Sequence, residues 1–72
     1  MQNYRVIFVK LINDSMEIEI IRADNELDAV KRHRAISEYD VSKLTTLEDV
    51  YLKIFKDNAF VICEEIKKQR AS

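Results

Sequence analysis

The sequence contains no glycine and no proline in 72 residues, although average usage would place about nine of the two in a chain of this length. Every tight turn must therefore form without the residue that most readily adopts a left-handed backbone. Asn and Asp are the other residues that tolerate this conformation, so turns are expected where they occur. The same absence excludes the glycine-dependent phosphate loops, dinucleotide-binding turns and nucleophile elbows of common enzymes.

Two segments near the N-terminus have the composition of β-strands. Tyr4 to Ile12 is rich in β-branched and aromatic side chains, and Met16 to Arg22 alternates apolar with charged residues. The connection runs through Asn13, Asp14 and Ser15. This pattern predicts a hairpin in which Asn13 or Asp14 takes the left-handed position.

The second of these strands has one apolar face. Met16, Ile18 and Ile20 lie on that face, and Glu17 and Glu19 lie on the other. Such alternation is typical of an antiparallel strand whose charged side meets water and whose apolar side packs on the core.

The first strand differs, because both of its faces are apolar. One set of side chains consists of Ile7, Val9 and Leu11. The other set, interrupted only by Lys10, consists of Val6, Phe8 and Ile12. A strand of this kind is expected in the centre of a sheet, covered on both faces. Either set can face the helices, which leaves the other set for another protein chain.

The middle of the chain is expected to be helical. Asp24 or Asn25 can cap a helix that extends to about Tyr39. Glu26 and Asp28 place negative charge in its first turn, where the helix dipole favours it.

A second helix is predicted from about Leu47 to Lys56. Thr45 and Thr46, followed three residues later by Glu48 and Asp49, form two overlapping capping-box patterns. The helix is amphipathic. Its apolar side consists of Leu47, Val50, Tyr51, Ile54 and Phe55.

Segment 59–70 allows two interpretations, because Ala59 to Cys63 has strand composition while Glu64 to Arg70 favours helix. We favour a strand that pairs with the central first strand. Residues 1–72 would then form one α+β domain of order ββααβ, a three-stranded antiparallel sheet with helices on one face.

Neither a catalytic set nor a metal site can be recognised. Cys63 is the only cysteine and His33 the only histidine, so no intrachain disulfide and no usual zinc site can form. Both are expected to be structural, and we expect no cofactor. The longest apolar run, Val6 to Ile12, is too short for a membrane span or a signal peptide, so we expect a cytoplasmic protein.

Lys31, Arg32 and Arg34 are the one feature that suggests nucleic-acid binding, because a basic helix can contact phosphates. At helical spacing, however, they spread around the helix. Asp28 and Glu38 lie four residues from Arg32 and Arg34 and would neutralise both charges. The net charge is −1, so nucleic-acid binding is the less favoured alternative, together with a structural role in a larger assembly.

The surplus of apolar surface on the sheet favours a protein partner instead, since one layer of helices covers only one face. We predict that Val6, Phe8 and Ile12 form the binding surface, with Leu52 of the second helix as a secondary candidate. The partner would be a second copy in a homodimer or a foreign protein.

The strand VIFVKLI (Val6 to Ile12), the turn from Asn13 to Met16, the charged second strand, the helical middle and the closing DNAFVIC (Asp57 to Cys63) form a recognisable layout. This layout resembles small accessory proteins of tailed bacteriophages, in particular the T-even phage antitoxins that block a host mRNA-cleaving toxin. The resemblance implies a non-enzymatic inhibitor that binds a host protein in the host cytoplasm, and it assigns no functional residue.

Overall fold

Residues 1–67 are described by the computed structural model, in which six segments of regular structure follow one another. In chain order they are β1 (Gln2–Lys10), β2 (Ser15–Ala23), α1 (Glu26–Arg32), α2 (Arg34–Ser37), α3 (Leu47–Phe55) and β3 (Ala59–Ile66). The predicted α+β fold class is confirmed, with all three helices between the second and third strands.

The strands form one antiparallel sheet of order β2-β1-β3, so β1 is central as predicted. β1 ends at Lys10, earlier than expected, and Leu11 and Ile12 belong to the turn. The backbone N–H of Leu11 still donates to the carbonyl of Asn58 at 2.9 Å. Segment 59–70 is a strand as far as Ile66, and residues 68–70 lie outside the described residues.

Asparagine and aspartate take the backbone positions that glycine usually occupies. Asp14, Asp40 and Asn58 have positive φ angles of 54°, 54° and 58°. Asp14 lies in the hairpin between β1 and β2, where the sequence predicted such a residue, and Asn58 lies between α3 and β3. The side-chain oxygen of Asn13 accepts a hydrogen bond from the backbone N–H of Ser15 at 3.1 Å, which closes the hairpin turn.

The helix predicted from Asn25 to Tyr39 is instead two short helices, α1 and α2, separated at His33. Asn25 caps α1 as expected, since its side chain accepts from the N–H of Asp28 at 2.8 Å. His33 then has an extended backbone, with ψ of 134°, which ends α1. Its ring nitrogen Nδ1 accepts from the N–H of Ala35 at 3.1 Å and so caps α2.

α3 follows the sequence prediction closely. Of the two overlapping capping patterns, the structure uses Thr46, whose hydroxyl oxygen accepts from the N–H of Asp49 at 3.2 Å. Val50 and Ile54 are fully buried. Phe55 was expected on the apolar side, but it is 64% exposed.

The hydrophobic core lies between the helices and one face of the sheet. Its buried apolar residues are Tyr4, Val6, Phe8, Ile21, Ala23, Ala29, Val30, Ile36, Val41, Val50, Ile54 and Ala59. Val41 comes from the irregular segment between α2 and α3, where no sequence pattern indicated a core residue. The ring centroid of Phe8 lies 5.9 Å from that of Tyr39 and 6.1 Å from that of His33.

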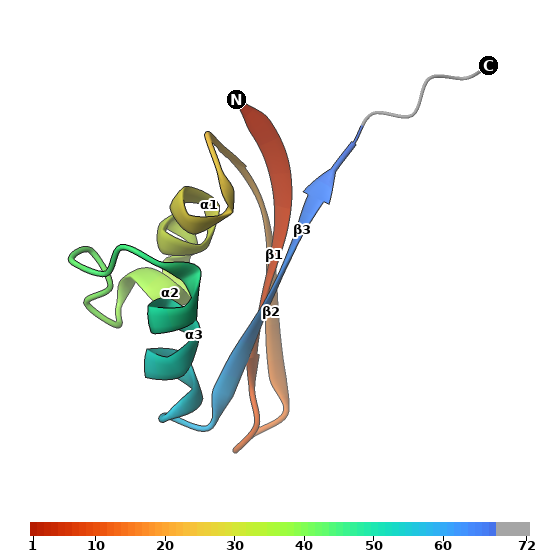
Figure 1. The fold of residues 1–72 in the computed structure, drawn as a ribbon. Helices are drawn as coiled ribbons and strands as arrows, with labels where there is room; N and C mark the ends of the chain where they lie inside the picture. Colours follow the sequence, from red (N-terminus) through yellow and green to blue (C-terminus); the bar gives the residue numbers. More distant parts are fainter. Residues whose placement is uncertain (68–72) are drawn as a thin grey trace.

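Figure 1 shows the sheet edge-on with α1, α2 and α3 all on the same side. No helix within residues 1–67 lies on the opposite face. One face of the sheet is therefore left open.

None of the helices within residues 1–67 has the length and apolar character needed to cross a membrane.

Candidate functional site

The side of the sheet that no described helix covers carries a continuous group of apolar side chains. We call this surface the open face; its apolar residues are Ile7, Val9, Met16, Ile18, Ile20, Phe60 and Ile62. Those on the two outer strands are between 37% and 60% exposed, whereas Ile7 and Val9 on the central strand are half-buried. Contiguous exposed apolar surface of this kind marks interaction sites on small soluble proteins.

The strand register arranges these side chains in rows, because residues opposite each other on neighbouring strands point to the same side of the sheet. Each row is named here after its β1 member. The Val9 row is Met16–Val9–Phe60 and the Ile7 row is Ile18–Ile7–Ile62. Both rows are entirely apolar and lie toward the β1–β2 turn.

The next two rows are more polar. The Arg5 row is Ile20–Arg5–Glu64, and the Asn3 row is Arg22–Asn3–Ile66. Arg5 Nη1 lies 3.2 Å from Glu64 Oε2, an exposed ion pair that adds little to stability. The face thus has an apolar end and a charged end.

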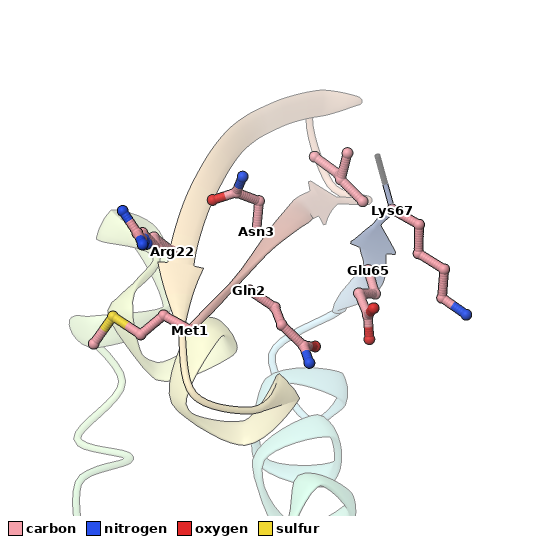
Figure 2. Close-up of a pocket in the computed structure, with 7 residues that line it drawn as sticks. Met1, Gln2, Asn3, Arg22, Glu65 and Lys67 are labelled. Carbon is pink, nitrogen blue, oxygen red and sulfur yellow. The ribbon is translucent and has the colours of Figure 1, made fainter. Parts of the chain in front are cut away.

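A hollow of about 510 Å³ adjoins the charged end (Figure 2). Arg22 lies on one side of it, Glu65 and Lys67 lie on the other, and Asn3 lies between them. The remaining lining residues are Met1, Gln2 and Ile66. The lining therefore offers amides and opposite charges, but no histidine, cysteine or hydroxyl group that could act as a nucleophile.

Two of the predicted binding residues lie in the core. Val6 and Phe8 are 0% and 4% exposed, because the helices cover the face of β1 to which they belong. Neither side chain is therefore accessible to a partner in this fold. Ile7 and Val9, from the alternative set, lie on the open face.

The other two predicted binding residues are accessible but lie elsewhere. Ile12 is 77% exposed in the β1–β2 turn, beyond the end of the strand. Leu52 is 58% exposed on α3, in the helical layer and away from the open face. The structure does not bring these two residues together with the open face into one surface.

The second strand was expected to bury its apolar face and expose its charged one, and the structure has the reverse. Met16, Ile18 and Ile20 are exposed, while Glu17 and Glu19 point to the side of the helices. Glu19 Oε2 accepts from the backbone N–H of Arg34 at 2.9 Å, at the start of α2. The start of α2 thus provides a partner for a carboxylate that the sequence suggested would face open water.

The basic residues that suggested nucleic-acid binding are partly engaged with the protein itself. Arg32 Nε lies 3.1 Å from Asp28 Oδ2, which confirms the predicted ion pair. Lys31 Nζ donates to the carbonyl of Ser42 at 3.3 Å. Lys31 and Arg32 belong to α1 and Arg34 to α2, so the break at His33 prevents a continuous basic stripe on one helix.

His33 is fully buried and joins the helical layer to the edge strand β2. Its Nε2 lies 3.1 Å from the carbonyl oxygen of Glu17, and its Nδ1 accepts from Ala35. A carbonyl oxygen can only accept, so Nε2 carries the proton and the neutral ring satisfies both contacts. Glu19 Oε2 lies 3.5 Å from Nδ1. These contacts give His33 a structural role.

Cys63 lies on the covered side of β3, half-buried, opposite Val6. Burial, with a smaller contribution from Glu26 and Glu64, raises the pKa of its thiol to about 11. A reactive cysteine requires the opposite shift, so this thiol is poorly suited to nucleophilic chemistry.

Within residues 1–67, no three His, Cys, Asp or Glu side chains gather in a way that could hold a metal ion. Comparisons of the chain with family models, with curated proteins and with solved structures found no match.

The open face was not predicted as a unit, although the sequence contains a signal for it. Ile21 and Ala23 are apolar, and they alternate out of step with Met16, Ile18 and Ile20. They also directly precede the first helix, so the helical layer begins on their side of the strand. That junction could have assigned the covered face of β2.

Proposed function

We propose that this chain is a non-enzymatic protein-binding module whose open face docks against another protein chain. The observation that carries the proposal is the open face itself: seven apolar side chains on three strands, without a covering helix from residues 1–67. The flat, apolar shape of this surface suits a protein partner better than a small ligand, which prefers a concave pocket.

The energetics support this proposal. Fully burying an Ile or Met side chain contributes roughly 1.5–3 kcal/mol. Met16, Ile18 and Ile20 are more than half exposed, so covering them would recover about half of that amount for each. A domain of this length has only about 3–5 kcal/mol from its core. Covering the open face would therefore change the stability by an amount comparable to the total.

The biological role that we propose is that of an inhibitor or an adaptor that binds another protein, in the host cytoplasm if a phage encodes the chain. The resemblance to phage antitoxins supports an inhibitor. The proposal requires only that the module occupies a surface of its target, because no reaction is assigned to His33 or Cys63. Nucleic-acid binding is less well supported, since Lys31 and Arg32 are engaged within the protein.

The proposal can be tested with one matched pair of variants. Ile18→Lys changes an open-face residue that is 54% exposed, and Leu52→Lys changes a helical residue that is 58% exposed. The two add the same charge at nearly the same exposure. We expect Ile18→Lys to abolish binding to a protein partner and Leu52→Lys to retain it.

Binding would be measured by calorimetric titration of the purified partner, where burial of apolar surface gives a negative heat-capacity change. A foreign partner would first be captured from the native host and purified. Self-association of the chain would be measured from the heat of diluting the concentrated protein. If Ile18→Lys bound every partner as tightly as wild type, the open face would not be the docking surface. A salt-sensitive shift with random DNA would favour the nucleic-acid alternative instead.

A further inference from the structure

The proposed function leaves the occupant of the open face to be named. Resting on that function, we infer that the occupant is a second copy of this chain, so that two sheets pack face to face with their helices outside. Three properties of the face support a second copy: its extent, the arrangement of its apolar rows and the position of its charges.

The extent of the face suits a small dimer. Eight consecutive residues of β1, Asn3 to Lys10, have partners on both β2 and β3. At ~3.3 Å per residue and ~4.8 Å between strands, the flat footprint is about 370 Å². Side-chain relief raises the accessible area above this value, so a pair would bury several hundred Å² per copy. That is below the standard size of specific interfaces and in the range of weak or transient complexes, so we expect weak association, to be sought in the micromolar range.

The apolar rows are self-complementary. When two sheets pack face to face with nearly aligned strands, a two-fold axis running along the strands lays each row over the same row of the second copy. β1 then faces β1, and β2 faces β3. Met16 would lie over Phe60 and Ile18 over Ile62, so that both fully apolar rows are covered by apolar rows.

The charges favour this alignment over the other two-fold arrangement. An axis across the strands would reverse the rows. Centred on the Ile7 row, it would place Arg5 and Glu64 over Val9 and Phe60 and bury charges against apolar groups. Centred between the Ile7 and Val9 rows, it would pair only these two rows and leave the Arg5 and Asn3 rows without a facing row. With the axis along the strands, Arg5 of one copy lies over Arg5 of the other, and Glu64 of each copy lies over Ile20, one strand to the side of the other copy's Arg5. The two arginines are therefore flanked by two glutamates at the charged end of the interface, and each arginine keeps its own partner at 3.2 Å.

Sedimentation velocity on the full chain, across the micromolar concentration range, tests whether a second copy is bound. We expect wild type and Leu52→Lys to form dimers with the same dissociation constant. Ile18→Lys should raise that constant at least about 100-fold, because two isoleucines are lost per dimer. Circular dichroism would show that both variants are folded. If Ile18→Lys proved unfolded, Ile18→Thr would keep the strand propensity and make the same test.

Disulfide cross-linking tests the alignment, since inter-sheet disulfides are compatible with sandwich packing. A Cys63→Ala background would carry either Ile18→Cys or Ile62→Cys. We expect the mixture of the two chains to form a cross-linked pair on mild oxidation, and neither chain alone to do so. Efficient cross-linking of Ile18→Cys to itself would overturn the row-over-row alignment.

The outcomes separate this inference from the proposed function. A wild-type chain that stayed monomeric throughout the micromolar range would overturn the inference of a second copy. The proposed function would survive that result if a foreign protein bound wild type and failed to bind Ile18→Lys. A dimer unaffected by Ile18→Lys would overturn the inference, because another surface would then hold the copies together. It would overturn the proposed function as well if every foreign partner also bound Ile18→Lys as tightly as wild type.

Discussion

The covered face and the open face of the sheet are built from similar side chains but meet different surroundings. On the covered face, Val6, Phe8 and Ile21 are all less than 10% exposed, because the three helices lie on them. On the open face, Ile18 and Ile20 are more than half exposed. Apolar alternation thus determines which side chains share a face of a strand, while the attached helices decide which face becomes the core.

The edge strand β2 shows the difference most clearly. Glu17 and Glu19 lie on its covered side, where Glu19 Oε2 accepts a hydrogen bond from the N–H of Arg34 and the backbone carbonyl of Glu17 meets His33. Met16, Ile18 and Ile20 lie on its open side and are more than half exposed. The Glu19 carboxylate thus has a partner within the chain, whereas Ile18 and Ile20 leave water only if a second protein chain covers them.

The largest expected effect comes from placing the same charge on each face. Phe8→Lys would remove a buried aromatic ring and leave an ammonium group beneath the helices, at a loss of at least about 4 kcal/mol. This is comparable to the whole stability of such a small domain, so we expect an unfolded chain. Circular dichroism and urea denaturation would measure the loss.

Ile18→Lys is the matched variant on the open face. We expect it to remain folded and to lose only association, because its side chain is already 54% exposed. A folded Phe8→Lys together with an unfolded Ile18→Lys would mean that the helices cover the opposite face from the one described.

A smaller effect is expected at His33, which joins the two layers. His33→Ala removes the cap of α2 and the hydrogen bond to the Glu17 carbonyl and leaves a cavity, so we expect a loss of about 2–4 kcal/mol. His33→Asn keeps an oxygen that can cap α2 but is too short to reach Glu17. It should recover about 1 kcal/mol of that loss. Urea denaturation of the three proteins gives both differences.

If His33→Ala were as stable as wild type, the contacts of the ring would not join the helical layer to β2. A variant that stayed fully folded and yet lost binding would instead place His33 in the functional site. The binding titration with Ile18→Lys as the negative control distinguishes these two results.

Much of this fold follows from local sequence signals. The hairpin was predicted, and so were a cap at Thr45 or Thr46 and a left-handed residue at Asn13 or Asp14, because each depends on residues close in sequence. The central position of β1 was predicted from the apolar residues on both of its faces. The break at His33 was not predicted. It depends on a contact with Glu17, sixteen residues away, which no helical pattern reveals.

The candidate site was predicted in kind but not in its residues. An uncovered apolar face was expected from the two apolar sides of β1, and the structure has one. Val6 and Ile7 are equally apolar, so composition could not decide which side the helices would cover. The signal for that choice lay in β2, where Ile21 and Ala23 alternate out of step with Ile18 and Ile20 and lead directly into α1.

The covered face should also be visible in the titration of Tyr39. Burial, and then the 2.7 Å hydrogen bond to Asp57, raise the pKa of Tyr39 to about 12. The folded pKa exceeds the unfolded value of about 10. The contribution of Tyr39 to stability is therefore complete below pH ~10 and is lost as the pH rises through about 12.

The difference in tyrosinate absorbance between wild type and Tyr39→Phe would report this titration. Asp57→Asn should lower the pKa of Tyr39 but leave it above the unfolded value, because burial is the larger cause. A fall to the unfolded value would show that Asp57, and not the covered position, accounts for the shift.

The smallest expected effect compares two neighbouring residues of β3, one on each face. Burial raises the pKa of the Cys63 thiol to about 11, so little thiolate is present at pH 8. We expect iodoacetamide to modify it about 100-fold more slowly than an ordinary thiol of pKa ~8.5.

In a Cys63→Ala background, Ile62→Cys would place a thiol on the open face, one residue away. This thiol should react at an ordinary rate in dilute protein and more slowly as concentration rises, because a second copy then covers it. Mass spectrometry after timed quenching would measure both rates. Equal rates for the two thiols in dilute protein would contradict their assignment to opposite faces, and an Ile62→Cys rate independent of concentration would contradict the dimer.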